Sequence, residues 1–220
     1  MYVLLLCVLG VCLVFAAYNV FKEEKTGKNQ ISLSSEDEEV NHGEREVKQI
    51  HAQVKGYSFE ESVSNADVIA KVTIEAVAGE VGGNLPKTKF DSTLLDIYKD
   101  ENSLNETDFI KILQAGTDEV VVNNIEPFQK GDKLILFLSE TRNKDNTYWI
   151  LGEYSNYYEV KGEEIVKKNF VSESLKDIST QVKKKDISLP GLNKEVEKVQ
   201  QHFEKDVFVN KLKNEINNQQ

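Results

Sequence analysis

The sequence predicts a mainly β fold, built as a closed barrel or a sandwich, with helices before and after it. Short apolar segments follow one another between turn residues through the middle of the chain, which is typical of small β domains. One of these segments alternates apolar and polar residues, as a strand with one buried face does. The first 21 residues are instead almost uniformly apolar.

Composition and charge exclude several kinds of protein. The chain has 220 residues and a formal net charge of -10, and every charged side chain follows Phe21. An acidic domain repels phosphate backbones, so we expect no nucleic-acid partner. Cys7 and Cys12 both lie in the first apolar segment, so the remaining chain has no disulfide, thiolate metal site or cysteine nucleophile.

Residues 1–21 are expected to form a transmembrane anchor or signal segment. Residues 2–21 are long enough to cross a hydrocarbon core of about 30 Å as a helix. No Lys or Arg precedes them, which favours a retained single-pass anchor in the cell membrane over a cleaved signal peptide. The domain is secreted if the segment is cleaved, and a buried soluble helix is the third alternative.

Residues 22–53 are expected to form a flexible polar spacer. They hold few aromatic residues and include the acidic sequence 34–39, Ser-Ser-Glu-Asp-Glu-Glu. Such a segment buries too little apolar surface to offset its chain entropy. A cation site is the alternative interpretation of the acidic sequence, and a solvated tether is the preferred one.

Residues 54–170 are expected to form the β domain. Ser58 and Glu61 have the spacing of a capping box, which predicts a short helix to Ser64. A half-buried strand follows over Asp67–Val77, and three glycines and a proline in Gly79–Pro86 predict a loop. Further strands are expected over residues 87–98, 109–114, 119–122, 133–138, 148–152, 157–161 and 164–168.

Residues 171–220 are expected to form a helical tail. One helix is predicted over residues 175–184 and a second from Asn193 towards Asn217, on either side of Pro190. The second carries an apolar stripe at near-helical spacing. We expect the stripe to pack on the β domain, and contact with a partner helix or a membrane surface is the alternative.

The order of these segments resembles netrin-like modules, the OB-fold domains of tissue inhibitors of metalloproteinases. Residues 58–72, Ser-Phe-Glu-Glu-Ser-Val-Ser-Asn-Ala-Asp-Val-Ile-Ala-Lys-Val, are similar to the short helix that leads into the first barrel strand there. The segments that follow in the same order are Phe90–Lys99, Phe109–Gly116, Pro127–Leu138 and Tyr148–Tyr158.

This resemblance covers roughly residues 57–168 and implies a small OB-like closed barrel. Small exported proteins of Gram-positive bacteria have the same order of segments, so the resemblance also implies a domain outside the cytosol. Lys22, Lys25 and Lys28 formally favour the opposite orientation by the positive-inside rule. The animal inhibitors bind the protease zinc through an N-terminal cysteine, and this domain has no cysteine to which that chemistry transfers.

No residue pattern predicts catalysis, a cofactor or a bound metal. His42, His51 and His202 are far apart in the sequence and form none of the usual zinc spacings. Nucleophile-elbow, P-loop and dinucleotide-binding motifs are also missing from the sequence. We therefore expect a protein that is not an enzyme, and a hydrolase with an unrecognised site is the least favoured alternative.

Five aromatic residues form the candidate ligand surface: Tyr148, Trp149, Tyr154, Tyr157 and Tyr158. Barrels of the OB type use aromatic side chains to bind sugars or single strands. The alternative is that some of them are core residues and the rest form cross-strand pairs. The sequence thus predicts a membrane-anchored interaction module for an extracytoplasmic protein, with binding of an envelope polysaccharide as the second hypothesis.

Overall fold

The computed structural model describes residues 47–143, 145–188 and 195–219. The predicted anchor at residues 2–21 and most of the predicted spacer lie outside these ranges. Within these ranges, none of the helices has the length and apolar character needed to span a membrane.

Five strands close into a barrel, which confirms the expected OB-like fold. The barrel strands are β2 (Val68–Val81), β3 (Lys87–Asp100), β4 (Phe109–Ala115), β6 (Lys133–Glu140) and β7 (Thr147–Ile150). Around the barrel they follow the order β2-β3-β4-β7-β6, and β6 pairs with β2 to close it. The β4–β7 pair is parallel and the other four pairs are antiparallel. Numbered along the chain, the order is first, second, third, fifth, fourth, as in an OB fold.

The barrel interior is filled by apolar side chains that alternate along the strands. Val68, Ala70, Val72 and Ile74 point inward from β2, as the period-two pattern predicts. They meet inward residues of the other four strands. Phe128, from the β5–β6 connection, and Tyr157, from β8, also place their side chains in this core. The structure extends β2 to Val81, beyond the predicted strand end, because Gly79 adopts a φ of 135° at a register shift and lets the strand continue.

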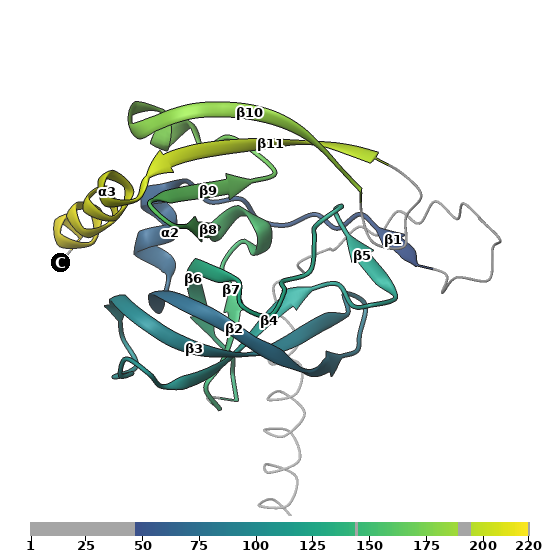
Figure 1. Cartoon of the computed structure of the whole chain (residues 1–220). Coiled ribbons are helices and arrows are strands. Elements are labelled where there is room, and N and C mark those ends of the chain that lie inside the picture. The colour runs from purple at the N-terminus through teal and green to yellow at the C-terminus, as the bar shows by residue number, and fades with distance from the viewer. Residues whose placement is uncertain (1–46, 144, 189–194, 220) are drawn as a thin grey trace, which may run out of the picture. The chain divides into compact units, whose positions relative to one another are not determined.

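The sheet of the barrel continues beyond strand β6, and this extension is called the second sheet here. Beyond β6 it adds β8 (Tyr157–Lys161), β9 (Glu164–Lys168), β11 (Glu195–Glu204) and β10 (Ser179–Ser188), in that order. The last two form a long antiparallel ribbon that arches over the barrel in Figure 1. Two short 3-10 helices, η1 (Glu153–Asn156) and η2 (Glu173–Ile178), connect these parts.

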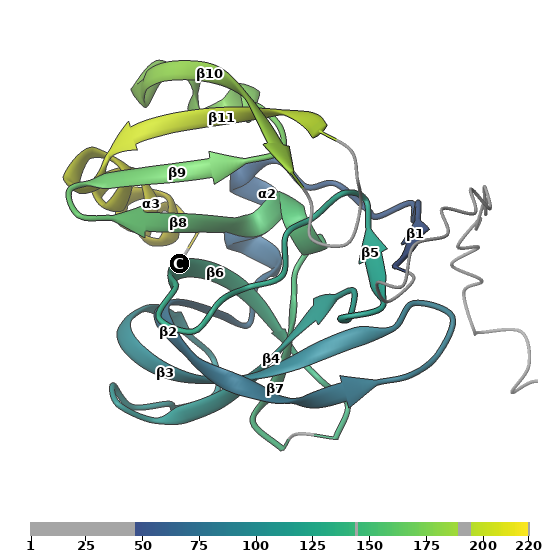
Figure 2. The ribbon, with the colours of Figure 1, turned by 45° about the vertical axis from the view of Figure 1, so that its right-hand side comes forward.

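Two helices cover one face of this second sheet (Figure 2). They are α2 (Phe59–Asn65) and α3 (Lys205–Asn218). The predicted capping box at α2 is confirmed, because the Ser58 and Glu61 side chains each accept a hydrogen bond from the other's backbone N–H. A second core fills the space between helices and sheet, with Phe59 and Phe208 packed edge to face at 6.0 Å between ring centroids.

The C-terminal region corrects the predicted helical tail. Residues 179–188 are strand β10 rather than part of a helix over 175–184, and residues 195–204 are strand β11, so the final helix begins only at Lys205. The apolar stripe is divided: Phe203 enters the second core from β11, and Leu212 and Ile216 enter it from α3. Apolar residues spaced three and four apart are typical of a helix, but a strand that joins an existing sheet can bury the same residues.

The end of the predicted spacer is also corrected. Strand β1 (Lys48–Ile50) pairs in parallel with β5 (Val120–Val122), so residues 48–50 are part of the folded domain. The side chain of Asn123 fixes the following segment through two hydrogen bonds to the backbone of Ala52, at 2.8 and 3.0 Å. These side-chain hydrogen bonds pair the backbone N–H and C=O of Ala52, as the backbone hydrogen bonds of a longer strand would do.

Candidate functional site

Three of the five predicted site residues are buried. Tyr148 and Tyr157 lie inside the barrel, and Tyr158 lies in the second core with its ring centroid 4.7 Å from that of Phe208. Their side chains keep 0%, 4% and 1% exposure. Burial also raises the pKa of Tyr157 to about 12, against the opposing charge of Lys168. A ligand at the surface therefore cannot reach these three rings.

The other two candidates reach the surface at different places. Tyr154 is half-buried in η1 and packs edge to face on Phe170, with ring centroids 6.2 Å apart. Trp149 is 37% exposed on the outer side of β7. The five residues thus do not form one exposed surface, and Trp149 is the member that a partner can contact most directly.

Trp149, on β7, lies beside the barrel face that OB folds commonly use for binding. This face consists of the second and third strands, here β3 and β4, and the loops beside it. In the parallel β4–β7 pair, Trp149 is in register with Leu113 of β4. The ammonium of Lys87, at the start of β3, lies 4.9 Å from the indole centroid, within cation–π range.

Lys87 links Trp149 to η1 through an ion pair with Glu153. Both side chains are largely buried, at 10% and 14% exposure, so water screens the pair only weakly. The other carboxylate oxygen of Glu153 accepts a hydrogen bond from the Ala115 N–H at 3.3 Å. Sequence reasoning missed Lys87 and Glu153, which are far apart in the chain and belong to no motif.

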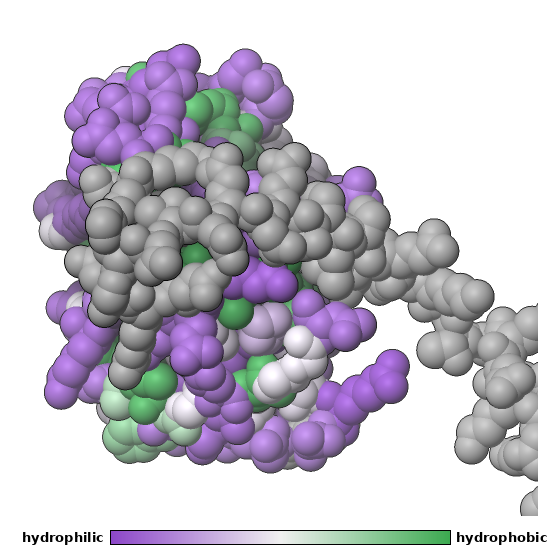
Figure 3. Space-filling model, turned by 90° about the vertical axis from the view of Figure 1, so that its right-hand side faces the viewer, coloured by the Kyte–Doolittle hydropathy of each residue, from purple (hydrophilic) through white to green (hydrophobic). Residues whose placement is uncertain are grey.

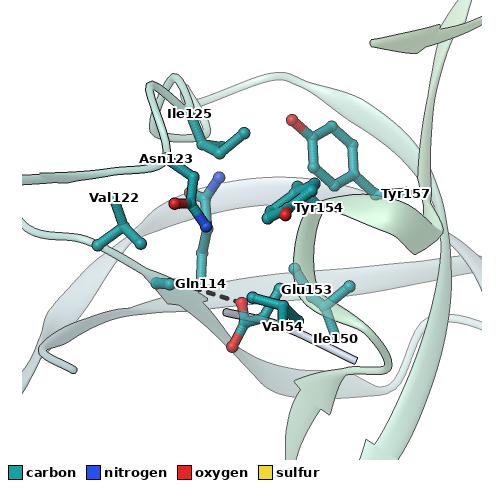
Figure 4. Close-up of a pocket in the computed structure, with 10 residues that line it drawn as sticks. Val54, Gln114, Val122, Asn123, Ile125, Ile150, Glu153, Tyr154 and Tyr157 are labelled. Carbon is teal, nitrogen blue, oxygen red and sulfur yellow. Dashed lines mark hydrogen bonds between the residues drawn. The ribbon is translucent and has the colours of Figure 1, made fainter. Parts of the chain in front are cut away.

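A small pocket lies beyond Glu153, at the barrel end near β5 (Figure 4). Its cavity volume of about 10 Å³ holds roughly one water molecule. Gln114 restrains its wall, because its side-chain amide donates to the Glu126 carbonyl at 3.0 Å and accepts from the Phe128 N–H at 2.9 Å. The pocket is too small for a sugar ring or a partner's side chain, so the candidate site is the outer face around Trp149.

A buried group of charges holds the long β5–β6 connection against the second sheet. Lys168 of β9 forms ion pairs with Glu159 and, at 3.1 Å, with Glu126. Burial alone would lower the pKa of Lys168, but hydrogen bonding and charge from Glu159, with the charge of Glu126, raise it to about 12. These residues pair with one another, so their arrangement explains a fixed loop rather than a reactive site.

The carboxylates and histidines of the described ranges form no metal centre. No three His, Cys, Asp or Glu side chains among those residues lie close enough to hold a metal ion. His202 pairs through Nδ1 with Glu164 at 2.8 Å, and His51 contacts Gln49 at 3.2 Å. His42 lies outside the described residues.

Comparison with known proteins adds no further assignment. No protein-family model and no curated protein matches this chain. The barrel supports an OB-like fold on its own geometry, whereas membership of the netrin-like family stays a prediction from the resemblance.

Proposed function

We propose that this chain is a non-enzymatic binding module whose barrel contacts a protein partner through Trp149 and its neighbours. The proposal keeps the membrane anchor at residues 2–21 and places the domain outside the cytosol, on the grounds of the apolar N-terminal sequence and the resemblance to exported modules.

The exposure of Trp149 is the observation that carries the proposal. Tryptophan is strongly enriched among the interface residues that contribute most binding energy, because its large ring removes much apolar area from water in one contact. The Lys87 ammonium, which is paired with Glu153, lies over the ring and restrains it. A partner therefore meets a positioned side chain and loses little conformational entropy on binding it.

The polar surroundings of Trp149 suit a protein surface. Lys111 and Asp91, neighbours on β4 and β3, are each about half exposed, with Nζ and Oδ1 4.0 Å apart. Charges of both signs at the edge of an aromatic contact are typical of interface rims. On the side of the molecule seen in Figure 3, the hydrophobic residues outside the grey atoms form separate small patches.

An envelope polysaccharide is the second candidate ligand. The observation in its favour is the exposed indole, since a sugar ring can stack on an aromatic side chain. A single exposed ring binds a polymer weakly, so a protein partner remains the first proposal.

Affinity capture with the full chain tests the proposal. The chain and its Trp149→Ala variant, reconstituted in nanodiscs, are incubated with envelope proteins and with insoluble wall material from the same cells. Val182→Ala is the matched control, because Val182 is also exposed, at 51%, but lies on β10. The proposal expects one enriched protein that Trp149→Ala loses and Val182→Ala keeps. Equal capture by all three forms would refute it, and Trp149-dependent retention on wall material alone would support the polysaccharide.

A further inference from the structure

A second hollow lies where the barrel, the second sheet and α3 meet. Its cavity volume is about 200 Å³, enough for a small organic molecule. Ile135 of β6, Val160 of β8, Ile165 of β9 and Val209 of α3 give it apolar walls. Trp149, Lys87 and Glu153 do not line it, so this hollow is separate from the contact proposed around Trp149.

The polar part of the hollow is rich in amines. Three lysines line it, against two aspartates, although the whole chain is acidic. Lys71 pairs with Asp96 at 2.8 Å, and Lys205 pairs at 2.9 Å with Glu163. Lys213 has no carboxylate within ion-pair distance among residues that the structure describes, so its charge is available to a ligand.

The helix and a tyrosine add two further groups that favour an anion. The hollow adjoins the first turns of α3, where Glu204 makes no side-chain capping hydrogen bond and the Glu163 carbonyl accepts from the Lys205 N–H at 2.9 Å. The helix dipole places partial positive charge at this end of α3. The same dipole stabilises the second aspartate, Asp206, in the first turn. Burial and the charge of Asp96 raise the pKa of Tyr98 to about 12, so its phenol remains a hydrogen-bond donor.

We propose that this hollow binds a small amphipathic carboxylate, with the carboxylate group at Lys213 and the α3 N-terminus and the hydrocarbon part between Ile135, Ile165 and Val209. An ion alone leaves the apolar walls uncovered, and a neutral alkyl chain leaves the Lys213 charge unpaired. A molecule that has both parts satisfies both halves of the site.

Methyl NMR of the full chain in nanodiscs tests this proposal with defined probes. The methyl groups of Ile135, Ile165 and Val209 report the apolar wall directly. Hexanoate is titrated beside hexanol, which has a similar chain without the charge, and inorganic phosphate, which has charge without the chain. We expect saturable shifts of these methyls with hexanoate and at least about five-fold weaker binding of either comparison probe, equivalent to about 1 kcal/mol.

Variants separate the two halves of the site. Lys213→Gln should weaken hexanoate about five-fold, and Val209→Phe should abolish its binding by filling the hollow. Lys183→Gln, which removes an exposed lysine of β10, should leave the affinity unchanged. The proposal is overturned if hexanoate shifts none of these methyls, if hexanol binds equally well, or if Lys183→Gln weakens binding as much as Lys213→Gln does. None of these outcomes bears on capture through Trp149, so the two proposals fail separately.

Discussion

Lys167 is a fully buried lysine whose charge should make the stability of the domain depend on pH. Its side chain, on β9, is 1% exposed. The ammonium donates a hydrogen bond to the Ser155 carbonyl and lies 4.5 Å from the ring centroid of Tyr158 and 4.4 Å from that of Phe170. No carboxylate among the described residues pairs with it, and burial lowers its pKa to about 7 from a model-peptide value of 10.5.

The direction and size of the effect follow from the two pKa values. Below pH 7 the ammonium is protonated in both states, so the full cost of burying the charge is present. Between pH 7 and 10.5 the unfolded chain binds more protons than the folded one, so the free energy of unfolding rises with pH. From pH 7 to 9.5 the gain from Lys167 is about 3 kcal/mol, at about 1.4 kcal/mol for each pKa unit.

The perturbation is Lys167→Met, measured by urea unfolding of the full chain and the variant in one detergent. At pH 7 the free energy of unfolding of the variant should be higher by about 3 kcal/mol. This figure already subtracts about 1 kcal/mol for the Ser155 carbonyl, which loses its hydrogen bond. At pH 9.5 the two proteins should be nearly equal in stability. Lys198, whose pKa burial lowers to about 8, contributes equally to both proteins and cancels. The range ends at pH 9.5 because the buried Tyr157, with its raised pKa, opposes the trend above pH 10. Stability curves that stay parallel for the two proteins between pH 7 and 9.5 would contradict the expected effect of Lys167.

Substitutions at three further positions test individual contacts by urea unfolding at pH 7. Lys87→Met should lower the free energy of unfolding by about 2 kcal/mol, because it leaves the largely buried Glu153 without its cation. An unchanged urea midpoint together with unchanged Trp149 emission would contradict this. Gly116→Ala should lower the free energy of unfolding by about 2 kcal/mol, because φ at this position is 104° and a Cβ would lie 2.9 Å from a backbone oxygen. A loss below about 0.5 kcal/mol would mean that the turn adapts to the side chain. Asp67→Ala should cost about 1 to 3 kcal/mol by removing the acceptor of the Glu140 N–H at 2.7 Å, whereas Asp67→Asn should recover part of it.

Local patterns predicted most of the barrel. The alternation along β2 and the capping box at α2 each depend on neighbours in sequence, and both agree with the structure. The helical tail predicted for residues 171–220 was partly wrong, because apolar residues spaced three or four apart are compatible with a helix and with a strand of a β-ribbon alike. Pairing of β11 with β9 over residues 200–204 decides between them, and that contact joins segments far apart in the chain.

The candidate site could be predicted only in part. A cluster of aromatic residues identifies a region, but the face on which each ring lies depends on register. Tyr148 and Trp149 are adjacent and therefore point to opposite sides of β7, one into the core and one to solvent. Lys87 and Glu153, which position the indole, come together only after the barrel closes.

Trp149 offers the most direct test of the central claim, since it is the only tryptophan of the chain. The emission of this residue, and its quenching by acrylamide, are measured while the captured partner is titrated. If the barrel binds through this face, emission shifts to shorter wavelength and quenching falls in proportion to the bound fraction, because the indole loses contact with water. A partner that saturates the chain while emission and quenching stay constant would contradict the account.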